Sequence, residues 1–76
     1  MEKFVGIDIS KDTLDVCIDP GAEALHVAYD HQGIEAICQR LKTEGPTLIV
    51  VEATGGLEMR LASELAALGL NIAVIN

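Results

Sequence analysis

Aromatic and basic residues are scarce in this sequence. Its 76 residues include one Tyr, one Phe and no Trp, so a hydrophobic core must be built from Ile, Leu, Val and Ala. Lys and Arg total 5 against 12 Asp and Glu, a net charge of −7, whereas phosphate binding relies on clustered cations. The composition therefore argues against a segment that binds nucleic acid by itself. A solvated surface best explains most of the acids, but the surplus also fits a site that collects divalent cations.

The sequence also lacks the cysteine patterns and long apolar runs that define other protein classes. Cys17 and Cys38 have neither a Cys-x-x-Cys spacing nor nearby His ligands, which favours buried, reduced thiols over a zinc site or a disulfide. No apolar run approaches the roughly 20 residues that span a bilayer, and the N-terminus lacks the features of a signal peptide. We therefore expect one small, soluble cytoplasmic domain without a membrane partner.

Three strands are predicted in the first part of the chain. Residues 3–9 are almost continuously apolar, which predicts a central strand buried on both faces, with Asp8 as the exception. Apolar and polar residues then alternate over 13–19 and again over 25–29, with turn residues between the segments. This pattern predicts a three-stranded antiparallel meander.

The period of the pattern changes after residue 30. Apolar residues recur at helical spacing over 34–41, with Asp30 as the N-cap and Gly45-Pro46 as the end of the helix. A strand is predicted over 47–51, ending at Glu52, followed by a helix that carries four leucines and Met59 in the core. Residues 70–75 form the last predicted strand.

The predicted order is β-β-β-α-β-α-β, which matches an α/β fold of the ribonuclease H-like type. In that fold the first strand is central in a mixed five-stranded sheet. The second and third strands add on one side in antiparallel order, and the fourth and fifth add on the other side in parallel order. The final strand-helix-strand unit should be a right-handed crossover.

Asp8 and Glu52 are the candidate metal ligands and catalytic residues. They lie near the carboxyl ends of the first and fourth strands, which are neighbours in this fold and about 4.8 Å apart. Two carboxylates so placed can share a divalent ion or frame two ions roughly 3.5 to 4 Å apart. The structural alternatives are a carboxylate that initiates the turn after Asp8 and a solvent-exposed strand end at Glu52.

The remaining polar residues have weaker functional interpretations. Thr54-Gly55-Gly56 precedes a helix and can hold phosphate, but a plain N-cap explains the segment better. His26 and His31 are too isolated for metal ligands and suit surface positions. Asp15 is expected to face solvent, although it could approach the metal site from the second strand.

The segments Gly6–Lys11 (GIDISK) and Val51–Gly56 (VEATGG) resemble the N-terminal half of the DEDD transposases. These are bacterial insertion-sequence recombinases of the Piv and MooV type, whose catalytic domain is similar to the Holliday-junction resolvase RuvC. The resemblance implies that Asp8 and Glu52 are two acids of a tetrad that binds Mg²⁺ or Mn²⁺ in a two-metal site. It further implies two more acids on a later helix, a DNA-attacking serine in a C-terminal domain and, in some members, a guide RNA. Residues 1–76 are then an inactive N-terminal part of the catalytic domain.

Two alternatives stay open at this point. The actin and sugar-kinase ATPases share the topology and a similar opening strand, but their phosphate hairpin usually has a glycine where this chain reads Ile9-Ser10-Lys11. A non-catalytic interaction module would also account for the acidic charge. Because the later helices are missing, we expect one sheet face and the last strand to be exposed and the chain to form a homo-oligomer, specifically a dimer.

Overall fold

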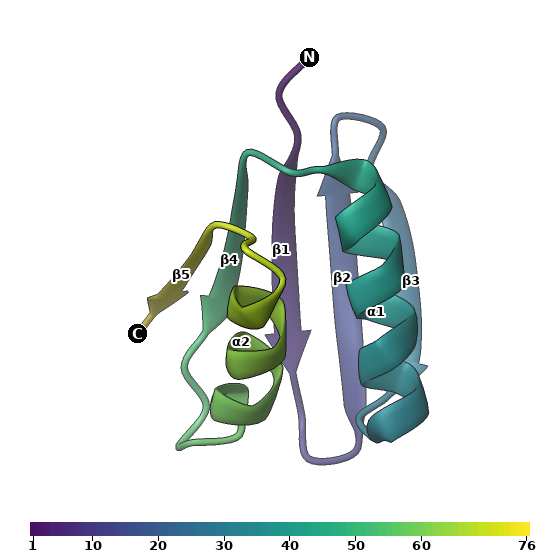
Figure 1. Cartoon of the computed structure of the whole chain (residues 1–76). Coiled ribbons are helices and arrows are strands. Elements are labelled where there is room, and N and C mark those ends of the chain that lie inside the picture. The colour runs from purple at the N-terminus through teal and green to yellow at the C-terminus, as the bar shows by residue number, and fades with distance from the viewer.

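The computed structural model describes every residue from Met1 to Asn76 and has two layers, a sheet and a pair of helices (Figure 1). The elements follow in the order β1 (Phe4–Ile9), β2 (Thr13–Asp19), β3 (Glu23–Ala28), α1 (His31–Glu44), β4 (Leu48–Glu52), α2 (Glu58–Ala67) and β5 (Ile72–Ile75). This is the predicted order. Helix α1 begins directly after its predicted N-cap Asp30, whereas α2 and β5 begin one or two residues later than their apolar patterns suggested.

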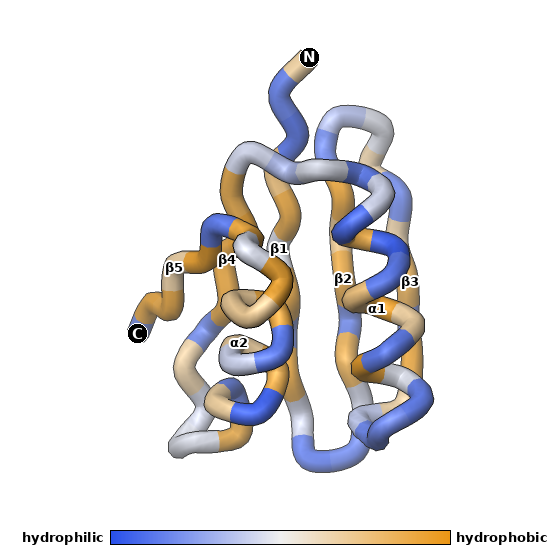
Figure 2. The backbone as a smooth tube through the Cα atoms, viewed as in Figure 1, coloured by the Kyte–Doolittle hydropathy of each residue, from blue (hydrophilic) through white to orange (hydrophobic).

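The five strands form one mixed sheet in the order β3-β2-β1-β4-β5. Strand β1 is antiparallel to β2 and parallel to β4, β2 is antiparallel to β3, and β4 is parallel to β5. The strands carry most of the apolar residues, and the turn between β1 and β2 is hydrophilic (Figure 2). The predicted topology, with β1 in the centre, is therefore confirmed.

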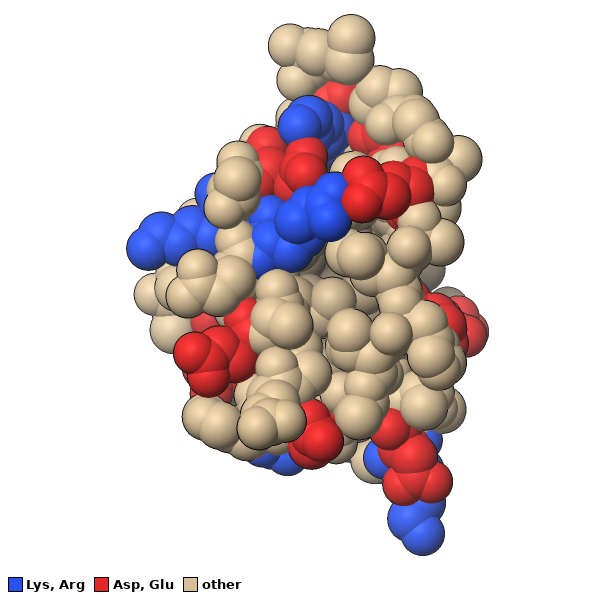
Figure 3. All heavy atoms as spheres, turned by 90° about the vertical axis from the view of Figure 1, so that its right-hand side faces the viewer, with Lys and Arg blue, Asp and Glu red and all other residues tan.

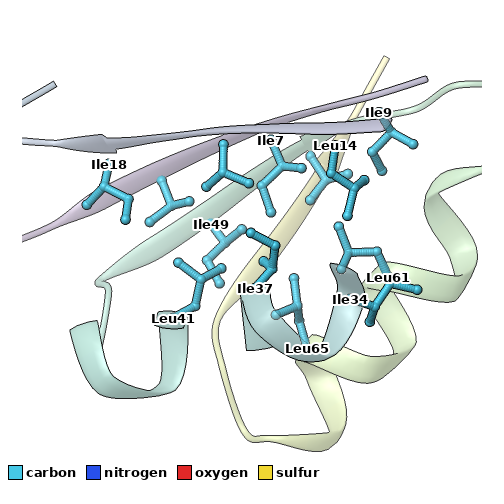
Figure 4. Close-up of a cluster of buried hydrophobic side chains, with 13 residues drawn as sticks. Ile7, Ile9, Leu14, Ile18, Ile34, Ile37, Leu41, Ile49, Leu61 and Leu65 are labelled. Atoms are coloured by element: carbon cyan, nitrogen blue, oxygen red, sulfur yellow. The ribbon is translucent and has the colours of Figure 1, made fainter. Parts of the chain in front are cut away.

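Both helices lie on the same face of the sheet and cover a single hydrophobic core (Figures 1 and 4). The core consists of 13 buried aliphatic side chains: Val5, Ile7, Ile9, Leu14, Val16, Ile18, Ile34, Ile37, Leu41, Ile49, Val51, Leu61 and Leu65. Along β1 and β2 these residues alternate with exposed ones, as a strand with one buried face requires. Because a right-handed crossover places α1 and α2 on the same side, no element covers the opposite face, which we call the open face.

The open face corrects one prediction from the sequence. Strand β1 is buried on one side only, and its other side, which includes Phe4, Gly6 and Asp8, is exposed. Its nearly continuous apolar run predicted burial on both faces because Phe4 and Gly6 are counted as apolar whether or not anything packs on them. Asp8 is therefore in contact with solvent and does not carry the cost of a charge buried in a strand.

Two further predictions about burial were also wrong. Met59 and all four leucines from Leu57 to Leu68 were expected in the core, but Met59 is 64% exposed, and Leu57 and Leu68 are exposed as well. Helix α2 presents only Leu61 and Leu65 fully to the sheet. Cys17 is exposed on the open face and Cys38 is half-buried, although both are free thiols, as expected. Burial raises the pKa of the Cys38 thiol, and the charges of Glu64 and Glu35 raise it further.

The ends of α1 follow the prediction closely. The Asp30 side chain accepts a hydrogen bond from the Gly33 N–H at 2.8 Å, which caps the first turn. At the other end Gly45 has a φ of 59°, and its N–H donates to the Leu41 carbonyl, as in a left-handed helix terminus. Ion pairs then join this end to its neighbours, because Glu44 contacts both Lys3 and Arg40, and Arg40 also contacts Glu23.

This ion-pair network occupies the side of the molecule formed by α1 and β3. Figure 3 shows a group of Lys and Arg side chains on the upper part of that side, with Asp and Glu side chains directly beside it. The hydrogen bonds from Lys3 and Arg40 hold the pKa of Glu44 below its ordinary value. These two cations are therefore already engaged by carboxylates.

Candidate metal centre on the open face

Four polar side chains lie in a row across the open face: His26, Asp15, Asp8 and Glu52. Asp15 is directly opposite Asp8 in the pairing of β2 with β1, and His26 is directly opposite Asp15 in the pairing of β3 with β2. On the other side of β1, Ile7 pairs with Val51, so Asp8 and Glu52 each follow one residue later on adjacent parallel strands. The four strands β3, β2, β1 and β4 thus contribute one member each.

Strand alternation explains why these side chains share a face. In β1 and β2 the core residues Ile7, Ile9, Leu14 and Val16 point to the helices, so Asp8 and Asp15 between them must point away. The same alternation turns Glu52 away from the core after Val51. Asp8 and Glu52 also stand near the carboxyl ends of parallel strands, where ligands of open α/β sheets commonly bind.

The row lies in a wide, shallow hollow of about 490 Å³ on the open face. All four members line it, together with small and apolar residues of the neighbouring strands: Gly6, Ile7, Val16, Cys17, Ala24, Leu25, Val50 and Ile75. At Gly6, an added Cβ would meet no atom within 4 Å, so the hollow is open above β1. The carboxylates are consequently accessible from solvent.

His26 and Asp15 form a contact that the sequence interpretation missed. His26 Nδ1 lies 2.5 Å from Asp15 Oδ1, and because an ionised carboxylate can only accept, the imidazole nitrogen donates. The side chains are 65% and 56% exposed, so the pair contributes little to stability. The sequence does indicate that two adjacent strands of a meander each carry a polar residue on the solvent side, which is the only signal for this contact. The register that brings the two residues opposite each other could not be derived from the turn composition.

The chain supplies two of the ligands that a divalent cation needs at Asp8 and Glu52. Carboxylate oxygens are the donors that Mg²⁺ and Mn²⁺ prefer, so the type of donor fits. No group of three or more His, Cys, Asp or Glu side chains surrounds a common point that could hold a metal ion. The residues therefore fit part of a metal site, with room for further ligands.

The Thr54-Gly55-Gly56 segment does not form the N-cap that its sequence predicted. Helix α2 begins at Glu58, whose Oε1 accepts hydrogen bonds from the backbone N–H groups of Thr54 at 2.9 Å and Gly56 at 3.1 Å. These bonds, with the Thr54 N–H first, hold the pKa of Glu58 below its ordinary value. The Thr54 hydroxyl oxygen is buried without a hydrogen-bond partner. Because a carboxylate already occupies these amides, the segment does not offer them to phosphate.

The other candidates occupy ordinary structural positions. Ser10 Oγ contacts the Thr13 hydroxyl at 2.6 Å and bonds to its backbone, which closes the turn between β1 and β2. His31 lies on the first turn of α1, 3.6 Å from Glu35 and away from the open face. Neither helix is long and apolar enough to cross a membrane.

Comparisons with known proteins agree with this architecture. No curated protein sequence matches the chain. The solved structure of T. thermophilus RuvC in complex with a Holliday junction substrate is similar, with a TM-score of 0.58 and 13% identity over 97% of this chain. The alignment covers 64% of that RuvC chain, and at this identity it establishes the ribonuclease H-like fold alone. The family model described as transposase, the DEDD type of the IS110 group, matches residues 5–76. The chain belongs to this DEDD transposase family.

Proposed function

We propose that this chain supplies one half of the metal site of a DNA transposase, an enzyme that cuts and joins the ends of an insertion sequence. The observation that carries the proposal is the position of Asp8 and Glu52, side by side near the carboxyl ends of two adjacent parallel strands and exposed on the open face. Family membership and the RuvC-like fold support the reaction class.

In this proposal Asp8 and Glu52 hold divalent cations between them, with Mg²⁺ as the natural ion and Mn²⁺ as a substitute. Bound ions supply activation of the attacking oxygen and stabilisation of the leaving oxygen of a phosphodiester. The open hollow around the two carboxylates gives a DNA strand access to them. The remaining two acids of the tetrad come from outside residues 1–76, so this part of the catalytic domain is inactive alone.

DNA is the proposed partner, and most of its binding surface lies outside this chain. The similar RuvC structure contains a Holliday junction substrate, which supports DNA as the substrate in this proposal. In this chain, however, the net charge is −7 and both Lys3 and Arg40 are paired with carboxylates.

We also propose a bacterial cytoplasmic location, with a guide RNA as an optional component. Self-association is part of the proposal because Val74 and Ile75 of the edge strand β5 are exposed.

Nothing in the structure favours the sugar-kinase alternative. That interpretation requires a hairpin after β1 that holds phosphate through closely approaching backbone N–H groups. Here the turn is closed internally, because the Ser10 N–H donates to the Thr13 carbonyl and Ser10 Oγ contacts Thr13. The turn is therefore a local structural feature.

The test uses a protein that contains this chain together with the rest of its catalytic domain. Asp8→Ala and Glu52→Ala should each reduce Mg²⁺- or Mn²⁺-dependent DNA cleavage by more than about 100-fold, beyond the effect typical of residues that only support a ligand. Asp19→Ala is the matched control, since Asp19 is exposed on the same face at the far end of β2, opposite Phe4. Unimpaired cleavage by Asp8→Ala or Glu52→Ala would refute the assignment.

A further inference from the structure

The pair formed by Asp15 and His26 stands next to the proposed metal ligands without being one of them. Asp15 is directly opposite Asp8, and both side chains project from the open face into the same hollow. Directly opposite residues of antiparallel strands have Cβ atoms about 4.5 to 5.5 Å apart. Asp15 is thus the nearest acid to Asp8 on the side away from Glu52.

Two carboxylates in this arrangement repel each other. Like charges directly opposite in an antiparallel pair are destabilising, and the row adds Glu52 on the other side of Asp8. The ion pair between His26 and Asp15 does not offset this repulsion. Both side chains are more than half exposed, and exposed pairs stabilise a fold little. Stability therefore does not account for placing Asp15 opposite Asp8.

The hydrogen bond from His26 gives Asp15 a defined orientation. His26 Nδ1 donates to Oδ1 of Asp15, and the other carboxylate oxygen has no partner within the protein. Held on one side, the carboxylate is restricted in rotation and keeps its second oxygen available as an acceptor. Metal centres commonly rely on such outer carboxylates, which accept hydrogen bonds from groups around the ion and are themselves held by a neighbour.

We propose that Asp15 is a positioning residue of the metal centre, oriented by His26, and that it accepts a hydrogen bond from the hydration shell of the ion held by Asp8. The proposal rests on the function proposed above, since it requires Asp8 to bind a cation. It assigns His26 a role as the donor that fixes Asp15. Asp19 has no such role, because it lies at the opposite end of β2, beside Phe4.

The experiment measures binding of Mn²⁺ alone, without DNA, to the protein that contains the whole catalytic domain. Free Mn²⁺ is followed by electron paramagnetic resonance. Asp15→Asn and His26→Phe should each weaken Mn²⁺ binding by about 10- to 100-fold, the range seen when outer partners of a metal ligand are removed. His26→Asn should keep the affinity within about 3-fold of the wild type, because its amide can donate from nearly the position of Nδ1.

Two controls separate positioning from other effects. Asp19→Asn removes the same charge from the same strand and face, so an equal loss of affinity there would overturn the proposal in favour of general electrostatic attraction. A loss in His26→Asn equal to that in His26→Phe would overturn the donor role of His26. Far-UV circular dichroism verifies that each variant is folded, and His26→Leu replaces His26→Phe if the latter is not.

Asp8→Asn distinguishes failure of this proposal from failure of the proposed function. If Asp8→Asn abolishes Mn²⁺ binding while Asp15→Asn and His26→Phe bind like the wild type, the positioning role is wrong and the metal site stands. If Asp8→Asn also binds like the wild type, the metal site itself is wrong and the positioning role is lost with it.

Discussion

Gly33 offers a sharp test of the packing between α1 and the sheet. It is a buried residue in the first turn of α1, and its N–H is held by Asp30. A Cβ at this position would lie 1.7 Å from the carbonyl oxygen of Ala28 and 2.9 Å from its carbonyl carbon. Contacts between carbon and a carbonyl oxygen normally begin at about 3.3 Å. Gly33→Ala therefore forces the first turn of α1 to move by roughly 1.6 Å or β3 to give way.

The two contributions to stability have opposite signs. Helix propensity alone would favour alanine by about 1 kcal/mol, whereas overpacking in a well-packed region costs about 1 to 3 kcal/mol and occasionally more. The clash here is with the backbone of Ala28, which cannot rotate away. Ala28 is the last residue of β3, and the next residue is held by the hydrogen bond from the Tyr29 N–H to the Asp12 carbonyl. We expect a steric cost at the upper end of this range, about 3 kcal/mol, and therefore a net loss of about 2 kcal/mol.

Thermal unfolding followed by far-UV circular dichroism measures this loss. For a domain of this size, 1 kcal/mol corresponds to about 4 to 8 °C, so Gly33→Ala should lower the Tm by about 10 °C. Gln32→Ala, at the preceding exposed position of the same helix, is the control and should leave the Tm nearly unchanged. A Gly33→Ala variant that melts at or above the wild-type temperature would show that the approach of α1 to Ala28 is wrong.

Two other predictions concern the region around α2. Because the folded pKa of Glu58 lies below its ordinary value, the stabilisation by this carboxylate is complete above about pH 4.5 and is lost as the pH falls through the folded pKa. Chemical denaturation at a series of pH values should therefore show a smaller loss of stability in acid for Glu58→Gln, and an unchanged acid dependence would contradict this role. The Tyr29 hydroxyl donates to the Leu57 carbonyl and accepts from the Leu61 N–H, so Tyr29→Phe should cost about 1 to 3 kcal/mol and speed hydrogen exchange at Leu61. Unaltered exchange at that amide would refute the link.

The order of the strands and helices could be predicted because the relevant signals are local, and the pairing of the strands was then taken from the ribonuclease H-like fold that this order matches. In β2, Leu14, Val16 and Ile18 alternate with polar residues, and one buried face of a sheet imposes this period. Asp30 and Gly45 mark the ends of α1 because each can do what a helix terminus requires, one by accepting from an N–H group and the other by adopting a positive φ. Such features do not depend on distant parts of the chain.

The errors arose where burial depends on distant parts of the chain. The apolar residues of β1 do not reveal how many layers pack against the sheet, so β1 was predicted to be buried on both faces even though one exposed sheet face was expected. Met59 lies within an apolar helix pattern, but the direction of α2 leaves it exposed. At the start of α2, Thr54 has the right chemistry for an N-cap, yet the Glu58 carboxylate accepts from the Thr54 and Gly56 N–H groups and the Thr54 hydroxyl has no partner. Competition between two suitable acceptors is decided by backbone geometry.

The separation of the polar row from the core strengthens every experiment on the metal site. All 13 core residues lie between the two helices and the face of the sheet that they cover. Asp8, Asp15, His26 and Glu52 line the hollow on the other face. None of the four is buried, so removing one of them creates no cavity and leaves no buried group unpaired. Asp8→Asn even relieves repulsion with Asp15, and the folded protein should be at least as stable without metal. A loss of metal binding or DNA cleavage in these variants can therefore be attributed to the site itself, because the fold that aligns the strands does not depend on the charges they carry.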